Sequence, residues 1–413
     1  MNYVAPWWLP GGNLQTLWAA LPSQRFLGQQ PVFRRERWAT PDGDFVDVDW
    51  LEDMAPTLFT ACNALPLSPG DGAGLARGGP ALRPVAPTLF TSCHALPLSP
   101  GDGAGLARGG PALRPAPTLF TACNALPLSP GDGAGLARGG PALRPPAGEQ
   151  PLLVVFHGLE GSSASHYAEA FADVARERGW ACAVPHFRGC SGELNLAPRA
   201  YHSGDFAEID WILRRFASQH AGPVVAVGIS LGGNALMRWA AELGAEARQM
   251  VAAVASVCSP LDLAACGWAI GRGFNRQVYT RMFLRSMVPK ALKKLEQHPG
   301  LFDRQKLLAA RDLYAFDNVF TAPLHGFKDA NDYWARASAK PHLHRVAIPA
   351  LALNALNDPF IPRASLPQTS DVSGHVTLWQ PVDGGHVGFP SAPFPGHVRA
   401  MPAAVAAFLA AQL

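Results

Sequence analysis

The chain has 413 residues, of which 48% are hydrophobic and 16% are charged, so it can bury a large core and is not disordered throughout. Its formal net charge is only +3. This balance gives no electrostatic basis for binding nucleic acid, because such binding depends on basic side chains that neutralise phosphates.

The first residues, MNYVAPWWLPGGNLQTLW, lack a basic segment followed by an apolar one, and no stretch of about 18 residues is apolar throughout. We therefore expect neither secretion nor membrane spanning, and a cytoplasmic location. The seven cysteines include no Cys-x-x-Cys pair, which argues against a disulfide framework or a zinc site. We expect no cofactor and no metal ion.

Two short segments near the N-terminus predict an antiparallel hairpin. VFRRERWAT (residues 32–40) and DFVDVDWL (residues 44–51) show the alternation of strands, and a Pro-Asp-Gly turn separates them.

A 30-residue sequence, APTLFTACNALPLSPGDGAGLARGGPALRP, follows at residues 55–84. It recurs at 86–115 with two substitutions and at 116–145 unchanged. Each copy is rich in Gly and Pro and has one short apolar run, so it lacks a pattern that could stack into a solenoid. We predict that residues 55–145 are a disordered or loosely ordered loop insertion, with a docking arm as the alternative. Residues 1–54 and 146–413 would then form a single domain.

After the repeat, apolar runs of strand length alternate with helical patterns. The predicted strands are LLVVFHG (152–158), ACAVP (181–185), VVAVGI (224–229), VAAVASV (251–257), ALALNAL (350–356) and VTLWQ (376–380), and the predicted helices span 165–178, 205–218, 231–243 and the last residues to 413. With the hairpin, this pattern predicts an α/β fold with a mostly parallel sheet of about eight strands and helices on both faces.

The segment from Gly228 to Gly232 reads G-I-S-L-G, follows an apolar strand and opens a predicted helix. This strand–turn–helix context presents a serine hydroxyl at the end of a strand, beside a helix N-terminus. The two glycines allow the sharp turn and the close packing that it needs. We predict that Ser230 is a nucleophile.

A nucleophilic serine needs a base, and the base needs an acid to orient it. His386 lies in the loop DGGHVGF after one predicted strand, and Asp358 lies in NALNDPF after another. Both loops leave the sheet at the edge that carries Ser230, so we predict His386 as the base and Asp358 as the acid. Asp262, in SPLDL after the preceding strand, is the alternative acid.

The oxyanion of the tetrahedral intermediate needs hydrogen-bond donors. We predict that the backbone N–H of Leu231, directly after the nucleophile, is one donor. The N–H of Leu159, in the loop HGLEG, is the expected second donor. We interpret His157 as a residue that holds this loop, with substrate contact as the alternative.

The stretch from about 262 to 340 is not needed for the sheet and predicts a helical cap over the active site. Between Arg272 and Arg311 it carries ten basic and two acidic residues, with apolar residues at helical spacing. The simpler interpretation is a solvated face above an apolar underside. The alternative is an acyl-chain entrance that makes peripheral contact with an anionic membrane.

With these pieces placed, the sequence resembles the YheT-like family of α/β hydrolases. The matching stretches are WLPGGNLQT, HGLEGSSASHY, FRGCSGELN, RAYHSGD, GISLGGN, NALNDPF and GGHVGF. They cover nearly the whole chain outside the repeat, which family members lack. Carried onto the matching motifs, the family triad falls on Ser230, Asp358 and His386.

The resemblance implies the α/β-hydrolase fold and a serine hydrolase of carboxylic esters, with short- to medium-chain acyl esters or acylglycerol-like lipids as substrates. Acyl transfer to an alcohol would use the same machinery with a different second nucleophile. The alternative hypothesis is that the chain is not an enzyme but an interaction protein, with the repeat as its docking arm.

Overall fold

The computed structural model describes residues 3–21, 23–52, 149–391 and 393–413. The repeat at 55–145, predicted to be loosely ordered, lies outside the described residues. Within them, eight strands form one sheet. The strands are β1 (Phe33–Ala39), β2 (Phe45–Leu51), β3 (Leu152–Phe156), β4 (Ala181–Pro185), β5 (Val224–Ile229), β6 (Ala253–Val257), β7 (Ala350–Leu353) and β8 (Val376–Trp379).

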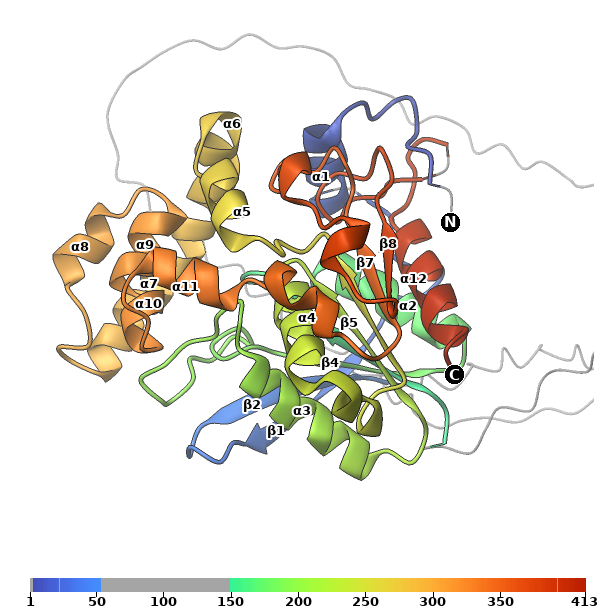
Figure 1. Cartoon of the computed structure of the whole chain (residues 1–413), viewed down its shortest axis with the longest axis horizontal. Helices are drawn as coiled ribbons and strands as arrows, with labels where there is room; N and C mark the ends of the chain where they lie inside the picture. Colours follow the sequence, from blue (N-terminus) through green and yellow to red (C-terminus); the bar gives the residue numbers. More distant parts are fainter. Residues whose placement is uncertain (1–2, 22, 53–148, 392) are drawn as a thin grey trace, which may run out of the picture. The chain divides into compact units, whose positions relative to one another are not determined.

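The strand order is β1-β2-β4-β3-β5-β6-β7-β8, as Figure 1 shows. The six strands from β4 to β8 in this order run parallel, and β2 pairs antiparallel with both β4 and β1. The predicted hairpin and the six predicted apolar strands are therefore confirmed, although several strands are shorter than their apolar runs.

Helices cover both faces of the sheet. The α-helices are α1 (Gly12–Ala20), α2 (His166–Glu177), α3 (Phe206–Gln219), α4 (Leu231–Leu243), α5 (Leu263–Ile270), α6 (Gly273–Asn275), α7 (Arg281–Gln297), α8 (Arg304–Ala309), α9 (Leu313–Val319), α10 (Thr321–Leu324), α11 (Ala330–Ala337) and α12 (Ala400–Ala410). Shorter helical turns are η1 (Gly244–Gln249), η2 (Arg276–Thr280), η3 (Lys340–Arg345), η4 (Arg363–Ser365) and η5 (Thr369–Asp371).

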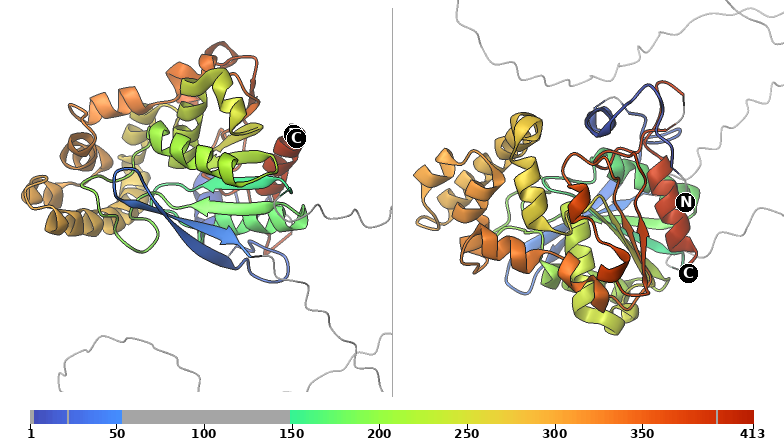
Figure 2. Two further views of the ribbon diagram at one scale, coloured as in Figure 1. Left: turned by 90° about the horizontal axis from the view of Figure 1, so that it is seen from below. Right: turned by 45° about the horizontal axis from the view of Figure 1, so that its top comes forward.

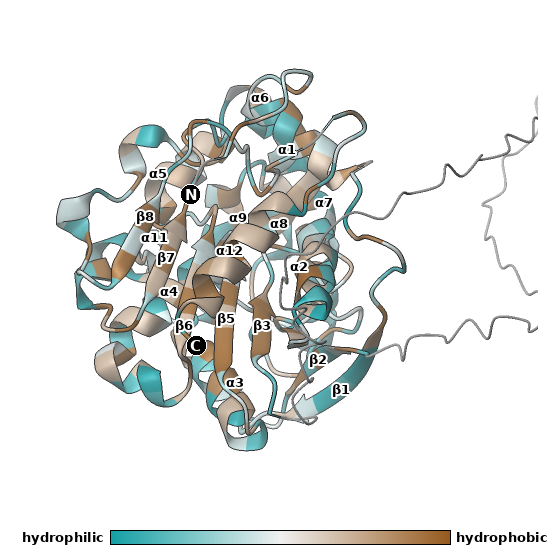
Figure 3. Ribbon diagram, turned by 90° about the vertical axis from the view of Figure 1, so that its right-hand side faces the viewer, coloured by the Kyte–Doolittle hydropathy of each residue, from teal (hydrophilic) through white to brown (hydrophobic). Residues whose placement is uncertain are grey.

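The two faces of the central strands bury separate halves of the core. Val154 and Ala226 pack with α3 and α4 on one face, whereas Val155 and Val227 pack with α2 and α12 on the other. A strand covered on both faces has no solvent-facing position, which explains the continuous apolar runs of β3 and β5. Figure 3 shows these strands among the most hydrophobic parts of the chain.

The connection from β6 to β7 contains α5 to α11, and we call residues 262–340 the cap segment. Figures 1 and 2 show these yellow-to-orange helices grouped beside the sheet rather than on either of its faces. In the described part of the chain, none of the helices combines the length and apolarity needed to span a membrane.

The two edges of the parallel strands differ in what they carry. The C-terminal ends of β5, β7 and β8 lie at the same edge, with β6 between β5 and β7, and the loops that follow the three strands contain the three predicted catalytic residues. At the opposite edge, the end of β2 lies next to the start of β4, which in turn pairs with the start of β3. The described chain therefore ends after β2 and resumes before β3 at the edge that faces away from Ser230.

Candidate active site

Ser230 sits in a strained turn between β5 and α4. Its φ of 52° and ψ of −117° are unfavourable for a residue with a side chain, and such strain costs about 1–3 kcal/mol. The glycines around it allow this geometry. A Cβ atom at Gly232 would lie 2.5 Å from the carbonyl oxygen of His157, and one at Gly228 would lie 2.5 Å from that of Gly232. Only glycine permits α4 to start this close to the neighbouring strands.

Ser230, His386 and Asp358 form one row of contacts. His386 Nε2 lies 3.0 Å from Ser230 Oγ, and His386 Nδ1 lies 2.8 Å from Asp358 Oδ2. A carboxylate can only accept, so Nδ1 donates to Asp358 and Nε2 is left to accept the serine proton. The other oxygen of Asp358 accepts the N–H of Phe360 at 2.8 Å, and the Phe360 ring packs 4.2 Å from the His386 ring.

The alternative acid has a different role in the structure. Asp262 is the N-cap of α5, where its carboxylate accepts the N–H of Ala265 at 3.0 Å. Asp358, by contrast, is almost fully buried directly against His386. The geometry therefore favours Asp358 over Asp262 as the partner of His386.

Helix α1 holds the histidine loop (residues 383–389) in place. Thr16 Oγ1 accepts the backbone N–H of His386 at 2.8 Å, and the fully buried Gln15 accepts another N–H of this loop, also at 2.8 Å. Asn357 donates to the same oxygen of Gln15 at 3.0 Å and accepts a third N–H of the loop at 2.9 Å. Uncharged side chains thus fix the backbone that carries His386.

The oxyanion loop (residues 157–161) is anchored from beneath by His157. This side chain is fully buried, and its Nε2 accepts the N–H of Phe187 at 3.0 Å. Its Nδ1 then donates to the carbonyl oxygen of Gly158 at 2.8 Å. Burial lowers the pKa of His157 to about 3, so the ring is neutral. These contacts agree with the interpretation of His157 as a residue that holds the loop.

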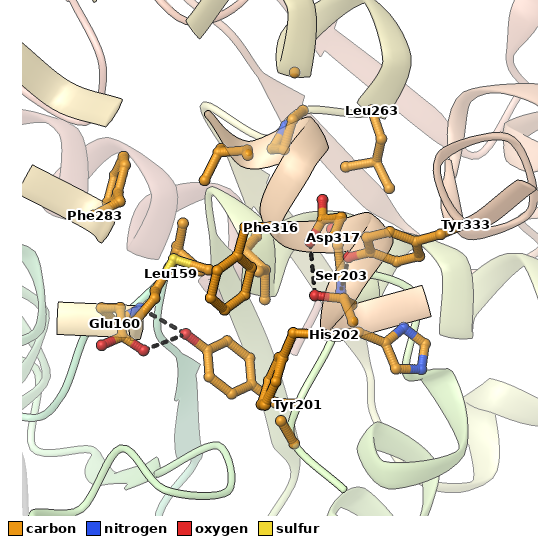
Figure 4. A pocket seen from close by; sticks show the side chains of 18 of the residues that line it. Leu159, Glu160, Tyr201, His202, Ser203, Leu263, Phe283, Phe316, Asp317 and Tyr333 are labelled. Carbon is orange, nitrogen blue, oxygen red and sulfur yellow. Dashed lines mark hydrogen bonds between the residues drawn. The ribbon is translucent and has the colours of Figure 1, made fainter. Parts of the chain in front are cut away.

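Glu160, in the same loop, has a left-handed backbone (φ 58°) and two partners from distant segments. The Tyr201 hydroxyl accepts the N–H of Glu160 and donates to its carboxylate, both at 2.9 Å (Figure 4). Burial raises the pKa of Tyr201, which keeps this hydroxyl protonated. On the other side, Lys290 of α7 lies 2.9 Å from Glu160 in an ion pair.

The two predicted oxyanion donors both border the pocket that contains Ser230. Within the described residues, the N–H groups of Leu159 and Leu231 donate to no protein acceptor, whereas Gly158 and Glu160 beside Leu159 donate to tyrosine hydroxyls. The two free N–H groups are therefore available for an oxygen of a bound molecule.

A pocket of about 1180 Å³, part of it open to solvent, leads from Ser230 into the cap segment. Figure 4 shows apolar side chains such as Leu263, Phe283 and Phe316 around it. The buried Asp317 adds a polar group to the lining, and Thr321 and Trp334 donate hydrogen bonds to its carboxylate at 2.6 and 2.9 Å. Burial raises the pKa of Asp317 to about 6. The pocket thus offers a mostly apolar space with few polar contacts.

Comparison with known proteins decides the family. Residues 151–393 match the family described as alpha/beta hydrolase fold. The chain belongs to the α/β-hydrolase family. Its curated relatives include YheT of Escherichia coli (strain K12), with 41% identity over 247 residues, covering 59% of this chain and 72% of that protein.

Other relatives of this α/β hydrolase are more distant. Phospholipase ABHD3 of Mus musculus is 30% identical, covering 59% of this chain and 59% of that protein. Monoacylglycerol lipase of Saccharomyces cerevisiae is 29% identical, covering 58% of this chain and 55% of that protein. The chain thus matches less than two thirds of the length of these two relatives.

Sequence reasoning missed the residues that hold the two loops of this α/β hydrolase. Gln15 and Thr16 lie in a helix that no periodicity predicted, since α1 is short and begins with glycine. Tyr201 and Glu160 were not singled out either. All four lie within stretches that carry the family resemblance, and this was the available signal.

Proposed function

We propose that this α/β hydrolase cleaves carboxylic esters through a Ser230–His386–Asp358 triad and an acyl-enzyme intermediate. The row of contacts at 3.0 and 2.8 Å, assembled from the ends of three strands, is the observation that carries this proposal. The names of two relatives, a phospholipase and a monoacylglycerol lipase, agree with ester hydrolysis.

In the first half of the proposed reaction, Ser230 Oγ attacks the ester carbonyl while His386 Nε2 takes the hydroxyl proton. Asp358 stabilises the imidazolium that results. The N–H groups of Leu159 and Leu231 bind the oxyanion of the tetrahedral intermediate. His386 then returns the proton to the leaving alcohol, and the acyl group remains on Ser230.

In the second half, water attacks the acyl-enzyme, and His386 again accepts and returns the proton, which releases the acid and restores Ser230. An alcohol in place of water would give acyl transfer by the same steps. The ratio of acid to new ester, measured with added alcohol, distinguishes hydrolysis from acyl transfer.

We infer that the acyl chain lies among the apolar residues of the cap segment. Phe283 and Met287 of α7 and Phe316 of α9 line the pocket that begins at Ser230. Such a lining favours an acyl chain over a polar group, because each buried methylene adds about 0.8 kcal/mol of binding. The proposed substrates are short- to medium-chain acyl esters or acylglycerol-like lipids. A series of p-nitrophenyl esters from acetate to palmitate measures this preference. Met287→Trp should shift it to shorter chains.

A fluorophosphonate probe tests the nucleophile directly. We expect labelling of the folded chain that disappears in Ser230→Ala and persists in Ser218→Ala, a matched change at an exposed serine on α3. Labelling that survives in Ser230→Ala would overturn the assignment. A folded wild-type chain that takes no label would instead favour a non-catalytic interaction protein.

A further inference from the structure

A groove lined by arginines lies on the outside of the cap segment. It runs between η2 and α7 on one side and α8 with the residues after it on the other. We call it the arginine groove. Its lining residues are Arg276, Gln277, Arg281, Leu284, Arg285, Val288, Leu308, Ala310 and Arg311.

The positive charges of the arginine groove lack acidic partners in the part of the chain that the structure describes. Among the described residues, none of its four arginines forms an ion pair with a carboxylate, and all four side chains are exposed. Arg214 on α3 shows the contrast, because it pairs with Asp210 and Glu246 at 2.7 Å each. Four like charges around one groove repel each other, and a bound anion would relieve this repulsion.

Helix α7 connects the groove to the substrate pocket. Phe283 and Met287 line the pocket, whereas Arg281, Leu284 and Arg285 line the groove. Because residues three or four apart share a helix face, these two sets form two separate faces of one helix. The groove therefore lies on the outer side of the pocket wall.

Exposed apolar side chains accompany the arginines. Phe274, Met282 and Leu308 are 53%, 54% and 41% exposed, and each lies within three residues of a groove arginine in the sequence. A nucleic acid or an acidic protein surface would satisfy the charges alone. A lipid surface satisfies both features, because headgroup phosphates pair with guanidinium groups and apolar side chains enter the acyl boundary.

We propose that the arginine groove binds phosphate-bearing headgroups of an anionic membrane and docks the cap segment on it. The proposed ester hydrolysis supplies the reason for docking, since lipid esters would then reach the pocket from the adjoining surface. The docking itself needs no catalysis, so the two proposals can fail separately.

Co-sedimentation of the full chain with lipid vesicles tests this proposal. Ser230→Ala prevents lipid turnover during the measurement. We expect binding to vesicles of phosphatidylcholine mixed with phosphatidylglycerol, little binding to phosphatidylcholine alone, and a decrease with rising salt. Adding Arg281→Glu and Arg285→Glu should weaken binding about 30-fold or more, because each basic residue at an anionic surface contributes about 1 kcal/mol.

The matched control reverses two charges at the other edge of the sheet. Arg34→Glu and Arg248→Glu change the net charge equally at exposed positions on β1 and in η1. This pair should retain most vesicle binding. Equal losses in both pairs, or binding unaffected by Arg281→Glu and Arg285→Glu, would overturn the proposal. Inorganic phosphate that raises the Tm of the wild-type chain but not of the Arg281→Glu, Arg285→Glu chain, without any vesicle binding, would point to a soluble phosphate ligand instead and would also overturn it.

Hydrolysis of a soluble p-nitrophenyl ester separates docking from catalysis. With Ser230 intact, Arg281→Glu and Arg285→Glu should leave this activity within about twofold, which also shows that the pocket is intact. If no chain hydrolyses the ester but wild-type vesicle binding depends on the groove, the proposed function fails and the docking proposal stands.

Discussion

The two loops beside Ser230 are held in different ways. The histidine loop is fixed by buried or partly buried hydrogen bonds with the uncharged side chains of Gln15, Thr16 and Asn357. The oxyanion loop has such contacts too, through His157 and Tyr201, but it is also paired through Glu160 with Lys290 of the cap segment. The backbone of the histidine loop is therefore held by α1 and the loop after β7, whereas the oxyanion loop also forms an ion pair with α7.

The hydrogen bonds of the histidine loop are stronger than the ion pair between Glu160 and Lys290. A buried donor or acceptor that loses its partner costs about 1–3 kcal/mol, which makes the support of the histidine loop stiff. The Lys290 side chain is 37% exposed, and ion pairs of this kind contribute about 0.2–1 kcal/mol. The ion pair that joins the oxyanion loop to α7 is thus weaker than the buried hydrogen bonds of the histidine loop.

The largest effect should follow from removing the base. His386→Ala should lower kcat/KM for a p-nitrophenyl ester about 10⁴-fold or more, because the proton of Ser230 then has no acceptor. His375→Ala, at an exposed position before β8, is the matched control and should retain activity. Substantial activity in folded His386→Ala protein would contradict the triad.

Next in size is the loss of core support for the histidine loop. Gln15→Leu leaves the N–H of Gly384 and the amide of Asn357 without their acceptor. We expect the free energy of unfolding to fall by about 2–4 kcal/mol and kcat to fall about tenfold or more. Urea unfolding and steady-state kinetics measure both. Gln219→Leu, exposed at the end of α3, should change neither.

A smaller effect should come from the clamp on the oxyanion loop. Tyr201→Phe removes the hydroxyl that accepts the N–H of Glu160. We expect kcat to fall about tenfold with little change in KM, because a misplaced Leu159 N–H weakens transition-state stabilisation more than substrate binding. A rise in KM at unchanged kcat would mean that Tyr201 contacts substrate without positioning the loop.

Removing the ion pair between Lys290 and Glu160 should have a smaller effect on kcat than removing the Tyr201 hydroxyl. Lys290→Met should reduce kcat about two- to fivefold at low salt, and the difference from wild type should shrink as salt screens the ion pair with Glu160. Lys293→Met, an exposed neighbour on α7, controls for the loss of charge. An effect of Lys290→Met as large as that of Gln15→Leu would break the distinction between the two loops.

Deleting residues 56–145 should have the smallest effect, because β2 ends and β3 begins at the edge of the sheet away from both loops. Ten residues would remain between Leu51 and Leu152. These strands are separated only by β4, about 10 Å, which ten residues span easily. We expect Tm and esterase activity to be unchanged within error. A loss of activity at unchanged Tm would show that the repeat serves the reaction, as a docking arm would.

Most of the fold could be predicted from the sequence because the parallel strands are covered on both faces. Their apolar runs, such as VVAVGI before Ser230, stand out from the surrounding helical patterns. The order of the strands and the position of the hairpin beside β4 do not follow from such patterns, since pairing depends on contacts between distant segments.

Of the residues in the site, only those in a sequence motif with a known chemical role could be predicted. Ser230, His386 and Asp358 occupy recognisable loops after strands, and the structure brings their side chains together. The supporting residues could not be assigned in this way. Gln15 acts on a loop 369 positions away, and Tyr201 acts on one 41 positions away. Their roles arise from tertiary contacts that leave no local periodicity.

The position of the repeat in the chain, between β2 and β3, bears on the history of the gene. A tandem duplication lengthens the chain at one point, and its copies can persist only if folding continues around them. Because β2 ends and β3 begins at the edge away from Ser230, each added copy lengthened a connection whose two described ends lie away from the proposed nucleophile. The same position would accept a fused reporter domain, which makes it a practical place to label this hydrolase.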